Sequence, residues 1–150
     1  MTIKQDTFKV TLSAFRASNN LVVNFFNHKE LQNGLRNLGL KPYEVVGYYK
    51  EQGEDVASYE LSLAVTGVTW EQLEAIYNLA LNYKQDSILV ESTGEVILVY
   101  VTESVDKDLS GLVFCDTELL GSNMVEVSQK EMEDNGAGTI VNGNKYYIVK

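Results

Sequence analysis

Cysteine and histidine are almost absent from this 150-residue sequence, and both shortages exclude kinds of chemistry. A lone cysteine, Cys115, rules out an intrachain disulfide and a zinc–thiolate cluster. Its apolar neighbours at 112–114 predict a buried or half-buried thiol rather than a nucleophile. The single histidine, His28, excludes a histidine pair as metal ligands, and we expect it at the surface, in the first turn of a helix. We therefore expect no metal, no cofactor and a reaction that needs few protein functional groups.

Positive charge and long apolar runs are also in short supply. Twelve Lys and Arg stand against 21 Asp and Glu, which gives a formal net charge of −9. An acidic surface repels phosphate backbones and anionic membranes but suits a cationic ligand, so we expect no nucleic acid and no membrane as partner. An acidic mimic of DNA is also compatible, although such mimics usually carry a larger acidic excess. No apolar run approaches the ~18 residues of a membrane span, and no signal core opens the sequence, which favours a cytoplasmic location.

The patterns that are present alternate between strand and helix. Residues 8–14 alternate apolar with polar side chains, as a half-buried strand does. A helix is expected to begin near Asn27 and to end at Gly39. Two β-rich runs, 43–51 and 56–66, flank a turn-like stretch and predict a hairpin.

A second helix and two further strands follow. Thr69 and Gln72 form a capping box that opens the helix. The runs 87–91 and 96–101 are strands on either side of a turn. The order strand, helix, strand, strand, helix, strand predicts an α+β fold with a ferredoxin-like βαββαβ core and an extra strand.

We expect one domain, with a core at about residues 8–101 and a C-terminal extension at 102–150. Within the extension, the acidic stretch 126–134 predicts a solvated loop or a short helix. The glycines of 136–138 indicate a flexible loop, and Asn142-Gly143 predicts a type I′ hairpin.

One face of the predicted sheet lacks a partner. Both helices of a ferredoxin-like fold lie on one face, so the other face should be polar. Instead Val45 and Val46 are adjacent, and residues 96–101 are apolar on both faces. We expect another copy of the chain to cover this second face, as in the trimeric PII-type signalling proteins, which use this topology.

The central hairpin carries the residues of most chemical interest. Tyr49 precedes its turn and Glu60 follows it, and a turn centred near residues 54–55 would make them cross-strand neighbours. Period-two alternation sends Leu61 and Leu63 under the helices and Glu60 to the other face. Two roles are open for Glu60 on this face: an acid at the surface or at an interface, or the counter-ion of a bound cation. In the second role, Tyr49 offers the cation an aromatic ring or a hydroxyl.

Four short stretches give the chain a family likeness. They are Leu12-Ser13-Ala14-Phe15-Arg16, Gly47-Tyr48-Tyr49-Lys50-Glu51, Gln85-Asp86-Ser87-Ile88-Leu89-Val90 and Leu98-Val99-Tyr100. By their order, and by the spacing from Tyr49 to Glu60 and on to Gln85, the chain resembles the phage-encoded S-adenosylmethionine lyases, long described as hydrolases. One departure is that Tyr59 precedes Glu60, where paired acids are expected in the family.

The resemblance implies a PII-like homotrimer with active sites between its subunits. It implies cleavage of S-adenosylmethionine to 5′-methylthioadenosine and L-homoserine lactone in the host cytoplasm, which depletes the host's methyl donor and counters restriction. Glu60 and Tyr49 are then catalytic. The implied substrate-binding residues are Ser13, Ala14, Phe15, Arg16, Gln85 and Glu95.

The chemistry of lactone formation agrees with the scarcity of catalytic side chains. The substrate's own carboxylate attacks its γ-carbon and expels a neutral thioether, so no base, acid or metal is required. Two alternatives remain at this point: a PII-like module that binds or senses a nucleotide without turnover, and an acidic phage protein that blocks a host enzyme. Turnover of S-adenosylmethionine separates the lyase interpretation from both of these alternatives.

Overall fold

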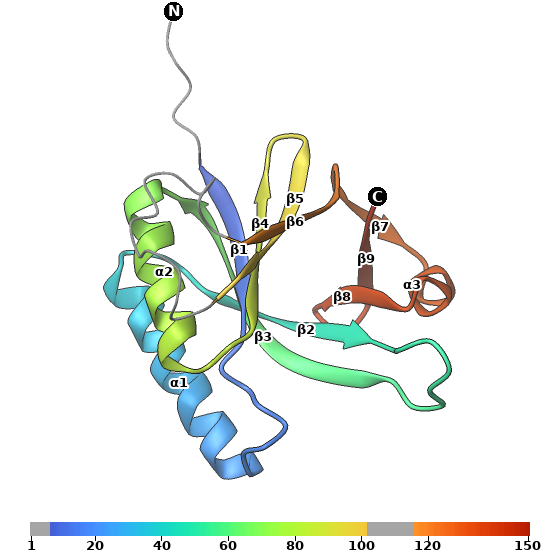
Figure 1. The fold of residues 1–150 in the computed structure, drawn as a ribbon, viewed down its shortest axis with the longest axis horizontal. Coiled ribbons are helices and arrows are strands. Elements are labelled where there is room, and N and C mark those ends of the chain that lie inside the picture. Colours follow the sequence, from blue (N-terminus) through green and yellow to red (C-terminus); the bar gives the residue numbers. More distant parts are fainter. Residues whose placement is uncertain (1–6, 102–115) are drawn as a thin grey trace, which may run out of the picture.

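All strands of the described residues join one curled antiparallel sheet (Figure 1). The computed structural model describes residues 7–101 and 116–150, so Cys115 lies outside the described residues. The sheet has nine strands in the order β6-β5-β4-β1-β3-β2-β8-β9-β7. The strands are β1 (Phe8–Leu12), β2 (Tyr43–Tyr49), β3 (Ser58–Val68), β4 (Ser87–Ser92), β5 (Glu95–Tyr100), β6 (Thr117–Gly121), β7 (Met124–Val127), β8 (Ala137–Val141) and β9 (Lys145–Val149). The helices are α1 (Leu21–Asn37), α2 (Trp70–Asn82) and α3 (Gln129–Asn135).

The mixed α+β character and the order of elements up to β5 confirm the expectation from the sequence. Strands β4, β1, β3 and β2 are neighbours in that order, and α1 and α2 connect β1 to β2 and β3 to β4. Figure 1 shows both helices on the same side of these strands. Within the described ranges, no helix combines the length and the apolar character needed to cross a bilayer.

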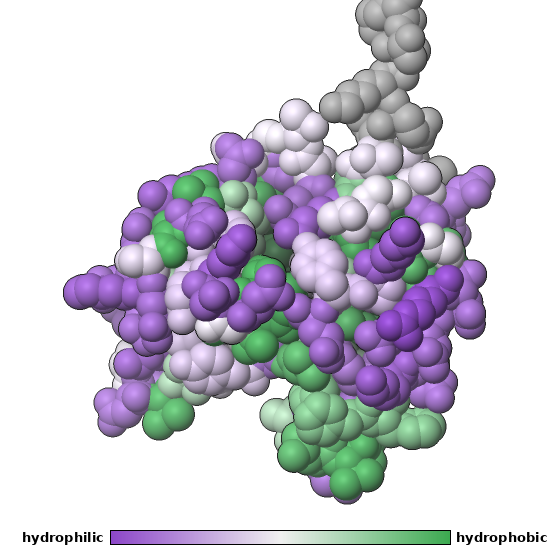
Figure 2. Space-filling model, turned by 180° about the vertical axis from the view of Figure 1, so that it is seen from behind, coloured by the Kyte–Doolittle hydropathy of each residue, from purple (hydrophilic) through white to green (hydrophobic). Residues whose placement is uncertain are grey.

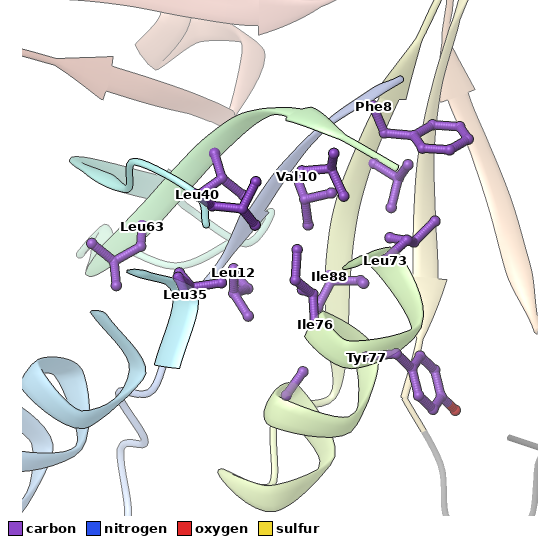
Figure 3. Close-up of a cluster of buried hydrophobic side chains, with 14 of the residues drawn as sticks. Phe8, Val10, Leu12, Leu35, Leu40, Leu63, Leu73, Ile76, Tyr77 and Ile88 are labelled. Carbon is purple, nitrogen blue, oxygen red and sulfur yellow. The ribbon is translucent and has the colours of Figure 1, made fainter. Parts of the chain in front are cut away.

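The main core lies between these two helices and the sheet (Figure 3). Strand β1 buries alternate residues, among them Val10 and Leu12, as its sequence pattern predicts. Helix α2 buries one stripe that includes Leu73 and Ile76, and its predicted capping box is present. Each large apolar side chain buried in this way contributes about 1.5–3 kcal/mol. The core therefore fixes the positions at which β1 ends and at which β3 and β4 begin.

Helix α1 begins earlier than the sequence analysis expected. It starts at Leu21, because the Asn20 side chain accepts a hydrogen bond from the Val23 amide at 2.9 Å and caps the helix. The expectation of a surface position for His28 is also wrong. His28 lies within α1, is only 1% exposed, and its Nε2 lies 2.7 Å from Oε2 of Glu44 on β2.

The C-terminal strands bend back toward the second face of the sheet. The edge strands β6 and β7 are joined by Ser122 and Asn123, whose amides both donate to the carbonyl of Lys150 after β9. The curl encloses a hollow of about 390 Å³, whose lining includes Leu89 of β4 and Met124 of β7. Part of the second face thus lies against the chain's own strands, whereas another copy of the chain was expected to cover it.

The C-terminal extension contains more regular structure than expected. The acidic stretch forms the short helix α3, capped by the Ser128 side chain. The predicted type I′ hairpin is confirmed, because Asn142 and Gly143 both have positive φ, at 56° and 74°. The expected flexible loop at the glycines is wrong: Gly136 ends α3 with a φ of 81°, and Gly138 is paired within β8.

We predict that Gly138→Ala destabilises the protein by about 1–3 kcal/mol, because a side chain has no space at this position. A Cβ there would lie 2.7 Å from the Tyr147 carbonyl oxygen and would overlap the side chain of Met132. Gly47→Ala is the matched control, since its nearest neighbour would be in ordinary contact at 3.7 Å. Urea denaturation measures both changes. Equal stability of the two variants would show that α3 moves aside at little cost.

Candidate active site

A pocket of about 390 Å³ opens beyond the end of β1, between β3 and the connection from α2 to β4. Its lining residues are Phe15, Arg16, Ala17, Ser18, Glu60, Lys84, Gln85 and Asp86. The structure thus brings together Phe15, Arg16, Glu60 and Gln85 from the sequence-based candidates. It adds Lys84 and Asp86, to which the sequence analysis gave no role. Both are sequence neighbours of the candidate Gln85, and two charged residues beside a candidate were the signal by which they could have been predicted.

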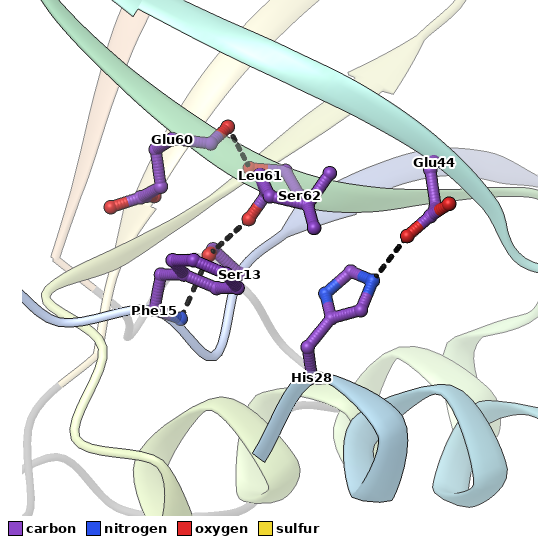
Figure 4. A network of polar contacts seen from close by, with 7 residues as sticks. All are labelled: Ser13, Phe15, His28, Glu44, Glu60, Leu61 and Ser62. Atoms are coloured by element: carbon purple, nitrogen blue, oxygen red, sulfur yellow. Dashed lines mark hydrogen bonds and ion pairs between the residues drawn. The ribbon is translucent and has the colours of Figure 1, made fainter. Parts of the chain in front are cut away.

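Ser13 ties the end of β1 to the neighbouring strand (Figure 4). Its buried hydroxyl donates to the carbonyl of Leu61 at 2.7 Å and accepts from the Phe15 amide at 3.0 Å. Ala14 is fully buried in the main core. Neither Ser13 nor Ala14 lines the pocket, so both support its wall from behind.

Two amide side chains hold the next part of this wall. Asn24 of α1 is buried; its Oδ1 accepts from the Arg16 amide and its Nδ2 donates to the Arg16 carbonyl, both at 2.9 Å. Gln85 donates through Nε2 to the Phe15 carbonyl at 3.0 Å. Asn24 was not among the residues predicted for the site, because the helix was expected to begin near Asn27 and begins at Leu21. A polar residue inside the apolar run 21–26 was the available signal.

The Phe15 side chain is held by other rings. Its ring makes edge-to-face contacts with Phe25, at a centroid distance of 5.2 Å, and with His28, at 5.9 Å. His28 is itself held by Glu44 (Figure 4). Offset and edge-to-face aromatic pairs of this kind fix ring orientation. The pocket therefore has one apolar aromatic wall among its charged residues.

Glu60 projects from β3 beside the Ser13–Phe15 backbone (Figure 4). Desolvation raises the pKa of its carboxyl; the Ser13 hydroxyl lowers it in part, and the Asp86 carboxylate raises it further. The residue as a whole remains accessible from the pocket, while its carboxyl is surrounded closely enough to lose water. A bound cation would offset both the cost of desolvation and the repulsion from Asp86.

Tyr49 and Glu95 lie outside this pocket. Tyr49 and Glu60 are not directly opposite each other, because the hairpin register places Tyr49 opposite Ser58 and Glu60 opposite Gly47, which makes the two residues diagonal neighbours. Tyr49 is 54% exposed. Glu95 begins β5 at the turn of the β4–β5 hairpin, whereas the pocket lies beside the start of β4.

Comparison with known proteins identifies the family. The model of the S-adenosylmethionine lyase family matches residues 10–150. The chain belongs to this family. It is an enzyme, an S-adenosylmethionine lyase, so the alternatives of a non-catalytic sensor and of a blocker of a host enzyme are set aside.

A solved phage S-adenosylmethionine lyase in complex with S-methyl-5′-thioadenosine is similar at 14% sequence identity. The similarity covers 78% of this chain and 89% of that chain, with a TM-score of 0.35. No curated protein matched the chain.

We predict that Glu60→Gln stabilises the folded lyase at pH 7. Because the folded-state pKa of Glu60 lies above its unfolded value of 4.5, folding favours the protonated form. The free energy of unfolding should therefore fall as the pH rises above about 4.5, and the glutamine variant should escape this loss. The gain should stay below about 1 kcal/mol, because water reaches the residue and screens its charge.

Urea denaturation at pH 4 and pH 7 measures this difference. The exposed Glu118→Gln removes the same charge elsewhere and should change stability little at either pH. A Glu60→Gln variant less stable than the parent at pH 7 would contradict the assignment of a desolvated carboxylate.

Proposed function

We propose that this lyase cleaves S-adenosylmethionine into 5′-methylthioadenosine and L-homoserine lactone by intramolecular attack. The observation that carries the proposal is the pocket itself, which combines acids, cations and an aromatic wall. Glu60 and Asp86 suit the sulfonium and the ammonium of the substrate, the cations Arg16 and Lys84 suit its carboxylate, and Phe15 offers an apolar face to the adenine.

The reaction needs little from the protein beyond binding and orientation. One oxygen of the substrate's carboxylate forms a bond to its γ-carbon while the bond from that carbon to sulfur breaks. The electron pair of the broken bond stays on sulfur, which leaves as a neutral thioether, and no proton moves. Holding the chain in an attack geometry can contribute about 7–11 kcal/mol in favourable cases. Two charges cancel in this step, so a site drier than water favours it.

The proposed roles follow from these needs. Glu60 orients the ammonium group or an ordered water. A hydrogen bond from either one stabilises the charged form of its desolvated carboxylate. Gln85 acts on the substrate through the Phe15 backbone that it holds. Ser13 and Ala14 keep this part of the wall in place.

We also propose that the β4-β1-β3-β2 part of the sheet with its two helices is a ferredoxin-like core, and that the enzyme assembles as a PII-like homotrimer with shared active sites. Exposed apolar side chains support an assembly: Leu21, Val22 and Phe26 project from the start of α1. Figure 2 shows an apolar projection at its lower edge, on the side of the molecule where α1 begins in Figure 1. The exposed Tyr49 and Glu95 would then complete a pocket on a neighbouring subunit.

The proposed biological role is depletion of the methyl donor in the host cytoplasm, which counters restriction and modification systems that depend on it. The high acidic charge supports this role, because it keeps the enzyme away from nucleic acid and directs it to a cationic small molecule.

We predict that lactone forms first and that Glu60→Gln lowers the rate by about 10²-fold or more by disturbing substrate orientation. Mass spectrometry of a reaction in heavy-oxygen water should find no solvent oxygen in freshly formed lactone. Homoserine should follow only by spontaneous hydrolysis. Direct release of homoserine that carries solvent oxygen on its side chain, without a lactone precursor, would show that water attacks the γ-carbon.

We predict that two inactive variants restore each other's activity when their subunits are mixed. If Tyr49 of one subunit completes the Glu60 pocket of another, trimers assembled from equal amounts of Tyr49→Ala and Glu60→Gln should regain about a quarter of the sites. Each variant alone should stay inactive. Mass measurement verifies that mixed oligomers have formed. If such oligomers recover no activity, either both residues belong to a site within one subunit, or Tyr49 does not belong to the site.

A further inference from the structure

Arg16 and Lys84 stand at the boundary between two hollows. Together with Ser18 they line both the pocket that contains Glu60 and a second hollow of about 450 Å³. The remaining residues of the second hollow are Asn19, Val23, Asn27, Asn82 and Tyr83. This lining contains two cations and no carboxylate, in a chain with a net charge of −9. The side of the boundary that faces the second hollow is therefore suited to an anionic group, whereas the first pocket also contains the acids Glu60 and Asp86.

The two cations are not equivalent, because Arg16 is already engaged. Its guanidinium donates through Nη1 to the carbonyl of Lys84 and through Nε to the Ser18 hydroxyl. Asn24 holds its backbone on both sides. Arg16 thus acts as a fixed part of the wall with some of its donors used.

Lys84 has a different position. Its φ of 57° is unusual for a residue with a side chain, and the hydrogen bond from Arg16 to its carbonyl holds this conformation. The turn ends α2 and keeps the exposed side chain of Lys84 at the boundary. Among the ion pairs of the described part of the chain, none includes Lys84. Its ammonium therefore has donors to offer a ligand.

We propose that Lys84 is a specificity-determining residue that binds the α-carboxylate of the substrate at the boundary of the two hollows. This inference rests on the proposed function. The carboxylate is the one anionic group of S-adenosylmethionine, and Arg16 and Lys84 are the cations that line the pocket. One carboxylate oxygen pairs with Lys84 while the other attacks the γ-carbon. Ring closure removes the negative charge, so the attraction ends when the lactone has formed.

The test compares two ligands that differ at the amino-acid end. Sinefungin keeps the carboxylate and does not react, whereas 5′-methylthioadenosine lacks the whole amino-acid end. Calorimetry should show that Lys84→Met weakens the binding of sinefungin about five- to thirty-fold. Binding of 5′-methylthioadenosine should change less than about two-fold, because that ligand makes no use of Lys84.

Matched variants separate charge from structure. Lys84→Arg should restore most of the affinity for sinefungin, and Lys145→Met, which removes an exposed lysine on β9, should affect neither ligand. Lys84→Asn, a residue that tolerates positive φ, replaces Lys84→Met if that variant does not fold. Equal weakening of both ligands, or no weakening of sinefungin, would overturn the proposal.

The failure of this inference can be told apart from that of the proposed function. Selective weakening of sinefungin by Lys84→Met, with no lactone formed by the parent enzyme, would leave the carboxylate site standing and overturn the reaction. Lactone formation by the parent, with sinefungin binding unchanged in Lys84→Met, would overturn the carboxylate site alone.

Discussion

Burial of the helix-facing side of the sheet holds the ends of β1, β3 and β4 in place against α1 and α2. The apolar residues of this layer, Val10 and Leu63 among them, are inaccessible to solvent, and a shift of one residue would turn them to the other face. The polar residues just beyond the core therefore have fixed positions. Ser13, Glu60 and Gln85 come from three separate parts of the chain and meet at one pocket wall for this reason.

Hydrogen bonds to backbone then give this wall its shape, and the site retains features that cost stability. Each hydrogen bond from Ser13, Asn24 or Gln85 contributes only about 0.5–1.5 kcal/mol, yet together they leave the backbone of residues 13–16 few alternative conformations.

The raised pKa of Glu60 and the positive φ of Lys84 both work against folding. Such features are expected where function requires charges that are already in position for the substrate, even at a cost to the stability of the fold.

The sequence predicted those parts of the fold that depend on local signals. The capping box of α2 and the Asn142-Gly143 hairpin each follow from a few adjacent residues. The register of Tyr49 depends on the length of the turn, which residue types do not determine. The start of α1 was missed because its first residues are apolar yet exposed, so their pattern does not mark a buried stripe. Asn24 escaped notice for the same reason.

The balance of charge in the pocket has a consequence for catalysis. Glu60 and Asp86 stand with Arg16 and Lys84 in a chain that is strongly acidic overall. The proposed reaction starts with a carboxylate and a sulfonium and ends with both neutral, so a cation that held the carboxylate too tightly would stabilise the ground state and slow the attack. Lys84 is exposed, and water screens its charge. A weak, screened pair can select and orient the carboxylate while leaving it reactive, whereas a buried arginine pair in the same place would bind the substrate well and turn it over poorly.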